Sequence, residues 1–415
     1  MTDQPSANTG WKKRAALFLF SQNVSLFGSS VVGFSIIWHI TLTTSSGTWL
    51  MLATICTVLP QVLVSLFGGV LADRYSRKAL IMLSDGFIAL ATLLLAIAFL
   101  LGYQRLELLL AVSAVRSIGA GIQTPAVNAI YPQLVPADQL TRVQGLNQTL
   151  NSVLMLLSPA VGGVILGSLG IVASFFVDVA TALLAILIMS RIRVERVESA
   201  DSHGSVWEDL RGGLGYTFAH RQLRRMLVCY MLAFFLITPA AVLSPLMVER
   251  NFGNEVWRLT ANEMVWTIGS LAGGLFVTWK KEFRDKIRTL ALCLVAFGVL
   301  FGLLGLSWDF ISFLVFMGIA GFFLPPMATA QTVYIQETTD PQVLGRVFSI
   351  VQIISASAMP VAILLFGPLA DIVSVESILL VTGVLLALVG VFYALAGRTN
   401  DAGRETGDKG LAFVA

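Results

Sequence analysis

Twelve apolar runs, each long enough for a membrane-spanning helix, follow one another along this 415-residue chain. An α-helix rises about 1.5 Å per residue, so about 20 apolar residues cross the hydrocarbon core of a bilayer. The chain is 56% hydrophobic and only 12% charged, whereas soluble domains carry about 25% charged residues. An all-α membrane protein is therefore expected, with transmembrane helices over residues 15–40, 48–71, 79–102, 106–132, 143–168, 170–190, 223–248, 255–279, 287–306, 309–332, 346–370 and 376–396.

The Lys and Arg residues indicate how these helices are oriented. Of the 27 basic residues, 23 fall in segments that share one side with the N-terminus, three fall in the opposite loops, and Arg116 lies within a helix. Because basic residues are retained on the cytoplasmic side of a membrane, we expect both termini to be cytoplasmic and the protein to be multi-pass.

A long polar and basic connection divides the chain in two. It predicts four regions: an N-terminal six-helix bundle over 1–190, a cytoplasmic linker over 191–222, a C-terminal six-helix bundle over 223–396 and a cytoplasmic tail over 397–415. Residues 207–218 of the linker place Trp and Leu side chains on one face of a helix, which is typical of a short helix on the membrane surface. A plain loop explains this segment equally well.

Two short echoes indicate that the halves are repeats. Gly121 and Pro125 have the same spacing as Gly321 and Pro325, and Leu-Thr-Arg-Val at 140–143 resembles Leu-Gly-Arg-Val at 344–347. Each echo falls at the same topological place in its half. The chain is therefore predicted to form two pseudo-symmetric six-helix bundles related as parallel repeats, an architecture of transporters.

Residues 69–78 read Gly-Val-Leu-Ala-Asp-Arg-Tyr-Ser-Arg-Lys between the second and third predicted helices. Such a charged hairpin marks a membrane surface, because it cannot lie in hydrocarbon. The run resembles the signature loop of the major facilitator superfamily of transporters, with Ser76 where that family usually has glycine. The resemblance implies a cytoplasmic gate in which Asp73 approaches the N-terminus of helix eleven. To this gate we assign Asp73, Arg74, Arg77, Lys78, Arg142 and Arg346. Positive-inside topology alone is the plainer alternative.

Four ionisable residues lie within predicted helices, where a charge is costly and usually functional. Residues 116–121, beginning with Arg116, resemble a fourth-helix pattern that the family associates with proton coupling. Buried carboxyl groups can exchange protons near neutral pH, so Glu263, Asp178 and Asp85 are candidates for coupling. We rank Glu263 first, expect Asp178 to have the depth to pair with Arg116, and assign Asp85 to the charge network around loop 69–78. Purely structural pairing is the alternative.

The family resemblance also implies a central cavity lined by helices one, four, seven and ten. Aromatic and amide side chains on these helices suit a bulky amphiphilic substrate. The predicted lining is Gln22, Asn23, Phe34, Trp38, Gln123, Asn128, Phe234, Phe235, Phe322 and Phe323. An aromatic residue taken singly is more often explained by packing or by contact with lipid than by a cavity.

Further resemblances narrow the function. Residues 158–163 resemble an antiporter motif, and residues 115–119, 124–126, 139–141 and 344–349 resemble bacterial macrolide-efflux-type members of the superfamily. They imply a proton-driven exporter of macrolides or other amphiphilic compounds in the bacterial cytoplasmic membrane. Siderophore exporters and lysophospholipid carriers share much of the pattern and stay open as alternatives, as does import by symport. Residues 367–371, Gly-Pro-Leu-Ala-Asp, echo the opening loop on the outer side.

An enzyme is the alternative from another class. It would need convergent His, Cys or paired acidic residues, but the three Cys and three His are scattered, and the sequence has no glycine-rich phosphate loop followed by Lys-Ser or Lys-Thr. We therefore expect no catalytic residues, no metal and no cofactor. The expected partners are a small amphiphilic substrate, protons and the lipid bilayer, without nucleic acid, and we expect a monomer.

Overall fold

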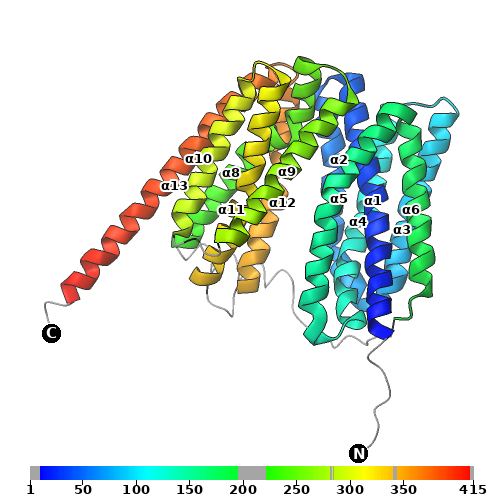
Figure 1. Cartoon of the computed structure of the whole chain (residues 1–415), viewed down its shortest axis with the longest axis horizontal. Coiled ribbons are helices and arrows are strands. Elements are labelled where there is room, and N and C mark those ends of the chain that lie inside the picture. Colours follow the sequence, from blue (N-terminus) through cyan, green and yellow to red (C-terminus); the bar gives the residue numbers. More distant parts are fainter. Residues whose placement is uncertain (1–9, 195–220, 281–282, 284, 340–343, 412–415) are drawn as a thin grey trace, which may run out of the picture. The chain divides into compact units, whose positions relative to one another are not determined.

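The computed structural model describes residues 10–194, 221–280, 283, 285–339 and 344–411 (Figure 1). Within these ranges the chain forms long helices joined by short turns and one 3-10 turn, with no strand. The first six helices are α1 (Gly10–Thr44), α2 (Gly47–Arg74), α3 (Arg77–Leu100), α4 (Leu106–Leu134), α5 (Leu140–Leu169) and α6 (Ile171–Arg191). The other six are α8 (Arg221–Phe252), α9 (Val256–Lys280), α10 (Lys286–Gly305), α11 (Phe310–Thr338), α12 (Leu344–Leu369) and α13 (Val375–Leu411).

All twelve predicted helices are present, so the predicted all-α class is confirmed. Several run further than their apolar cores: α1 begins at Gly10 and α13 continues to Leu411 through sequence that we had assigned to the tail. The predicted bounds came from counting apolar residues. A helix ends only where its backbone hydrogen bonds end, so it can continue beyond the hydrocarbon core. The predicted helix over 207–218, with most of the linker, lies outside the described residues.

Ten of the twelve helices in the described part are long and apolar enough to cross a membrane. Helix α9 is not among them, and it carries Arg258, Asn262 and Glu263 within its first half. The apolar stretch described in α12 is the shorter Ile353–Leu369.

By contacts between residues the chain divides into two units. The N-terminal unit comprises Met1–Ser202 with Gly253–Ala261, and the C-terminal unit comprises His203–Phe252 with Asn262–Ala415. Helices α1 to α6 belong to the first. Helices α8 and α10 to α13, with the larger part of α9, belong to the second.

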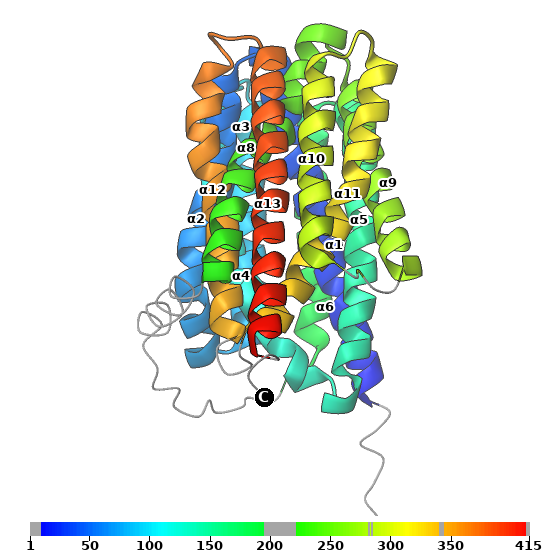
Figure 2. The same ribbon diagram turned by 90° about the vertical axis from the view of Figure 1, so that its left-hand side faces the viewer.

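Both units pair their helices in the same way. In the N-terminal unit α1 packs against α5 and α6, α3 packs against α4 and α6, and α2 packs against α4. In the C-terminal unit α8 packs against α12 and α13, α10 packs against α11 and α13, and α9 meets α11. The α10–α13 pair is seen side by side in both views (Figures 1 and 2). Each of these five pairs has its counterpart in the other unit, which confirms two pseudo-symmetric six-helix bundles.

Close helix packing in the N-terminal unit depends on glycines without side chains. A Cβ atom on Gly68 of α2 would lie 2.6 Å from the carbonyl oxygen of Gly121 in α4. Pro125 cannot donate the hydrogen bond that this carbonyl would receive within its own helix. The free carbonyl therefore faces a glycine backbone, and the two helices approach closely.

An apolar cluster holds together one end of the N-terminal unit. Phe18 of α1 packs edge-on against Tyr131 of α4, with ring centroids 5.2 Å apart, and Ile81, Ile130 and Met189 are fully buried beside them. Between helices surrounded by lipid, close van der Waals packing of this kind is what holds the helices together. The cluster fixes α1, α3, α4 and α6 relative to one another and so positions the polar residues described next.

Candidate functional site

A cavity of about 440 Å³ lies within the N-terminal unit. This volume is within the range of about 300–1,000 Å³ that is usual for small-molecule sites. Its walls come chiefly from α1, α2, α4 and α5, and most of its lining side chains carry amide or hydroxyl groups. A hydrogen-bonding surface inside a helix bundle of this hydropathy is unusual, so we take the cavity as the candidate site.

Helical periodicity places the polar lining on one face of each helix. In α1, Gln22, Ser25 and Ser29 follow one another at intervals of three and four residues. In α5, Asn147 and Asn151 are four residues apart. Residues at these intervals lie on the same side of a helix, so each helix presents its polar groups to the cavity.

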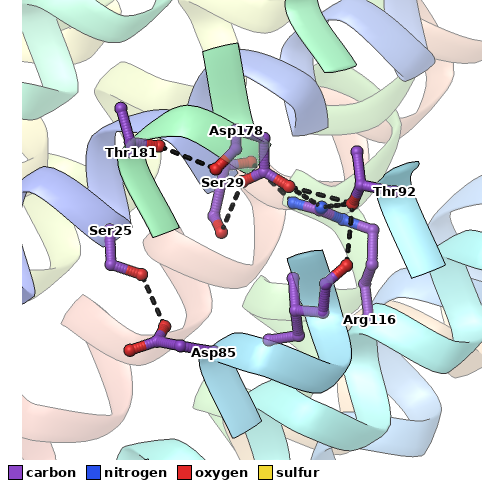
Figure 3. A network of polar contacts seen from close by, with 8 residues as sticks. Ser25, Ser29, Asp85, Thr92, Arg116, Asp178 and Thr181 are labelled. Carbon is purple, nitrogen blue, oxygen red and sulfur yellow. Dashed lines mark hydrogen bonds and ion pairs between the residues drawn. The ribbon is translucent and has the colours of Figure 1, made fainter. Parts of the chain in front are cut away.

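A buried ion pair forms part of the cavity wall. The Arg116 guanidinium donates to the Asp178 carboxylate and to the Thr92 hydroxyl, while the Ser29 hydroxyl donates to Asp178 Oδ1 at 3.2 Å (Figure 3). The Asp178 side chain is only 1% exposed and that of Arg116 is 11% exposed. Arg116 and Ser29 line the cavity, and Asp178 is not among its lining residues. The two charges therefore neutralise each other inside the unit, with the Arg116 guanidinium on the cavity side and the Asp178 carboxylate behind it.

Gly28 lets α1 approach α6 beside this pair. A Cβ atom at Gly28 would lie 3.0 Å from the Cα atom of Asp178. About two turns further along α1, the hydroxyls of Ser35 and Ser174 are 2.8 Å apart across the same interface. The predicted pairing of Asp178 with Arg116 is therefore present, and α6 supplies the carboxylate because small and hydroxyl-bearing residues bring it close to α1.

Asp85 is the second buried carboxyl group behind the cavity wall. Its Oδ1 accepts hydrogen bonds from Ser25 Oγ at 2.6 Å and from Gln123 Nε2 at 2.8 Å. Its Oδ2 is buried without a hydrogen-bond partner among the described residues. We had assigned Asp85 to the charges around loop 69–78, and that assignment is wrong, because its partners are these cavity-lining side chains. Within the described residues no cation pairs with this carboxyl group.

Four of the predicted lining residues are found at the cavity: Gln22, Asn23, Gln123 and Asn128. Two others from the N-terminal unit are not. Trp38 is 1% exposed and packs against Phe34, with ring centroids 5.5 Å apart. Trp38 is therefore part of the core, and the half-buried Phe34 packs on it one turn earlier in α1 and is not among the lining residues of the cavity.

The other four predicted lining residues are phenylalanines, two in α8 and two in α11. They belong to the C-terminal unit and do not line this cavity. Phe235 packs on Phe366 with ring centroids 5.3 Å apart. Phe322 has the same spacing from Phe276, while Phe323 packs edge-on against Phe322 and Phe234 packs against Tyr230. All four therefore have aromatic partners within their own unit.

Sequence reasoning missed the contribution of α5. Asn147 and Asn151 line the cavity, yet neither was among the predicted residues. The available signal was a polar first half of the helix, in which these two carboxamides lie four residues apart and therefore on one face. Thr92 was missed as well, and no sequence signal separates it from the many threonines that bond only to their own helix.

The cations of loop 69–78 make local contacts. Arg77 donates to the carbonyl oxygens of Ala72 at 3.2 Å and Ala129 at 2.6 Å, and Lys78 Nζ lies 2.8 Å from the Ser190 carbonyl oxygen. Cations near helix C-termini satisfy free carbonyls and complement the helix dipole. Ser76 accepts a hydrogen bond from the Ala79 amide and so caps α3, which gives the serine at this position a structural role.

The gate itself stays a prediction. The side chains of Asp73 and Arg346 lie outside the described part of the structure. Arg74, at the end of α2, and Arg142, in the first turn of α5, are exposed. Of the predicted gating cations, Arg77 and Lys78 at the start of α3 thus contact the ends of α2, α4 and α6.

Glu263 lies in α9 of the C-terminal unit and does not line the cavity. Its carboxylate has no ion pair among the described residues, and its backbone carbonyl accepts from the Thr267 hydroxyl. Asp371, the acid of the outer echo, pairs with Arg250 at 3.4 Å within the same unit. Across the described residues, no cluster of three His, Cys, Asp or Glu side chains could hold a metal ion.

Comparison with known proteins gives a consistent family. A sequence profile of the Major Facilitator Superfamily matches residues 18–363. Macrolide efflux protein A of Streptococcus pyogenes is 30% identical over 387 residues, which cover 92% of this chain and 95% of that protein. The multidrug efflux pump Tap of Mycolicibacterium fortuitum is 24% identical over 93% of this chain and 96% of its own length. The staphyloferrin A transporter of Staphylococcus aureus is 21% identical over 91% of this chain and 95% of its own.

Solved structures give the same fold. The peptide transporter POT superposes with a TM-score of 0.74 at 12% identity, covering 93% of this chain and 94% of its own. The nucleoside transporter NupG superposes with a TM-score of 0.71 at 14% identity, covering 94% of this chain and 98% of its own. At these identities the likeness concerns the fold alone.

Proposed function

Because the chain belongs to the Major Facilitator Superfamily, and its fold and family are those of membrane transporters and not of enzymes, we propose that it exports macrolide-like or other amphiphilic molecules by proton antiport. One observation carries the proposal: a polar cavity of about 440 Å³ lies in front of two buried carboxyl groups, Asp85 and Asp178. The identity of 30% with macrolide efflux protein A supports the substrate class.

The proposed mechanism is alternating access in the bacterial cytoplasmic membrane, with both termini cytoplasmic. Substrate enters from the inside, the two six-helix bundles rock about the bound molecule, and protonation of a membrane acid resets the transporter. In this scheme Asp73 and its neighbouring cations form the inner gate. The protein acts as a monomer with the substrate, protons and lipid as its partners.

Asp85 gains support as a coupling acid. Its carboxyl group contacts cavity-lining side chains, has no cation bonded to it, and keeps one oxygen without a partner. Protonation therefore removes an uncompensated buried charge, and loss of the proton creates one. Asp178 already has Arg116 as its counter-ion and is the weaker candidate for coupling. Glu263 remains the candidate from the C-terminal unit.

Siderophore transport is the second candidate, because the staphyloferrin A transporter aligns over 91% of this chain. An anionic cargo would be favoured by unpaired cations in the cavity wall. The described lining contains one cation, Arg116, which Asp178 neutralises. This charge balance favours an uncharged or amphiphilic substrate.

Efflux of a labelled macrolide from cells overproducing the chain, with and without a protonophore, tests the proposal. We expect protonophore-sensitive efflux in the wild type. Efflux should be lost in the variant that removes the coupling residue, which is tested with Asp85→Asn, Glu263→Gln and Arg116→Ala. If the gate is correct, Asp73→Asn should also lose efflux. Glu107→Gln, which removes an exposed acid in the first turn of α4, is the matched control. Efflux that ignores the protonophore would refute proton antiport, and no efflux by the wild type would refute macrolide transport.

A further inference from the structure

The cavity in the N-terminal unit is rich in one functional group. Seven carboxamide side chains line it, contributed by α1, α2, α4 and α5: Gln22, Asn23, Gln61, Gln123, Asn128, Asn147 and Asn151. Each carboxamide offers a donor and an acceptor side by side. Pockets that bind apolar ligands are instead lined mainly by apolar and aromatic side chains, with few polar groups.

Several of these groups have unused hydrogen-bonding capacity. Gln22 and Asn23 are each 8% exposed, and Gln22 Nε2 and Asn23 Oδ1 are buried without a partner among the described residues. The Tyr131 hydroxyl beside them is also buried and unpartnered. The side chains of Asn147 and Asn151 are half-buried at the cavity wall. The unpartnered atoms of Gln22, Asn23 and Tyr131 have almost no accessible surface. The half-buried carboxamides of Asn147 and Asn151 are therefore among the groups that a ligand in the cavity would meet.

The charge of the lining points to an uncharged ligand group. Among the described lining residues there is no carboxylate, and the one cation, Arg116, is held by Asp178. Recognition there must therefore rest on neutral hydrogen bonds. Closely spaced hydroxyl groups, each both donor and acceptor, are the complement of paired carboxamides.

We propose that this cavity is a sugar-binding subsite, which takes the hydroxyl-bearing glycosyl part of an amphiphilic substrate. The inference rests on the proposed export function and adds to it the portion of the molecule that the N-terminal unit recognises. A site built to hydrogen-bond hydroxyl groups strongly rejects an analogue that lacks them, because its own polar groups are then left unpaired. The subsite should accordingly discriminate a glycosylated compound from its aglycone.

The test is equilibrium binding to the full chain in lipid nanodiscs, with two matched ligand pairs. One pair is a glycosylated macrolide and its aglycone, and the other is an alkyl glucoside and the parent alcohol. The variants are Asn147→Leu, Asn151→Leu and their combination, which remove the amides while keeping the side-chain size. Gln148→Leu, an exposed position of the same helix outside the lining, is the control.

We expect the double variant to weaken binding of the glycosylated macrolide about tenfold, because two hydrogen bonds are lost, and to change aglycone binding less than about twofold. Gln148→Leu should change neither. Equal losses for both members of a pair, or no loss for the glycosylated member, would overturn the subsite.

The alkyl pair separates this inference from the proposed function. If macrolides do not bind but the alkyl glucoside binds through Asn147 and Asn151, the macrolide function fails and the sugar subsite stands. If the macrolide is exported but the ratio of glycosylated to aglycone affinity is unchanged in the double variant, the subsite fails and the export function stands.

Discussion

The two units pair their helices in the same way but differ in the polar residues that they bury between those helices. The buried polar residues of the N-terminal unit include two acids, Asp85 and Asp178, whereas the described C-terminal unit buries uncharged polar residues only. The repeat offset that aligns Gly121 with Gly321 places Phe316 at the position of Arg116. Phe316 packs edge-on against Trp308. Helix pairing is thus symmetric, while the two buried acids of the described residues, and the buried ion pair, lie in one half.

Small residues explain why the pairing is shared. In the C-terminal unit a Cβ atom on Gly383 of α13 would lie 2.5 Å from the Gly302 amide nitrogen and 2.6 Å from the Gly298 carbonyl oxygen of α10. In the first unit Gly68 and Gly121 bring α2 and α4 together, and Gly269, which faces the Gly318 carbonyl oxygen, does the same for the counterpart helices α9 and α11. Backbone contact through glycine fixes which helices meet and leaves the polar positions free to differ between the halves.

The ion pair gives the largest expected effect. Arg116→Ala should lower the free energy of unfolding by about 3–5 kcal/mol, because it leaves Asp178 as an uncompensated buried charge. The double variant Arg116→Met with Asp178→Leu should recover most of that loss without recovering transport. Denaturation in detergent and efflux in cells measure the two quantities. If the double variant is no more stable than Arg116→Ala, the buried charge is not the cause.

Glycine packing gives the next effect, in the other unit. Gly383→Ala should lower stability by about 3 kcal/mol, because the added methyl group overlaps the backbone of α10. Gly274→Ala in α9 is the control: its Cβ atom meets nothing within 4 Å, so stability should stay equal or rise by up to about 1 kcal/mol. Thermal unfolding of the two variants measures the difference. Equal effects would show that the α10–α13 contact is looser than described.

The first residues of α3 and α10 give a smaller contrast. Arg77 donates to two backbone carbonyls, whereas Lys286 pairs with Glu337, which is 52% exposed, at 2.9 Å. Arg77→Met should cost about 2 kcal/mol because charged hydrogen bonds are lost, and Lys286→Met less than about 1 kcal/mol. Unfolding measured at low and high salt checks this, since salt should weaken only the exposed pair. Equal costs at both salt concentrations would contradict the contrast.

Helix starts give the smallest effect. In α11 Asp309 and Ser312 form a capping box, whereas the N-cap residue of its counterpart α4, Arg105, provides no side-chain cap. Hydrogen bonds from Ser312 lower the pKa of Asp309 below 3.8. The folded-state pKa is depressed, so the stabilisation is complete above about pH 4 and is lost as the pH falls through the lowered value. Asp309→Asn should abolish this pH dependence, with a midpoint shift below about 2 °C. A wild-type and variant difference that is constant between pH 5 and pH 2.5 would refute the assignment.

The sequence by itself determined the number of helices, the fold and the family. Each spanning helix must supply about 20 apolar residues regardless of its neighbours, and loop 69–78 is a local motif, so both signals survive without tertiary information. The depth of Arg116 along its helix also identified a pairing with Asp178 as feasible. These inferences concern position along the membrane normal, which residue counting measures directly.

Only the tertiary structure decided which polar residues meet. In a membrane protein most helix faces are apolar, so hydropathy does not distinguish a face turned to lipid from one turned to a neighbour. That rotation depends on glycine contacts such as Gly28 against Asp178. It sends Trp38 into the core, joins Asp85 to Ser25 and Gln123, and turns Asn147 and Asn151 toward the cavity. Rotation about each helix axis is set by packing between helices, and the order of residues along one helix does not contain it.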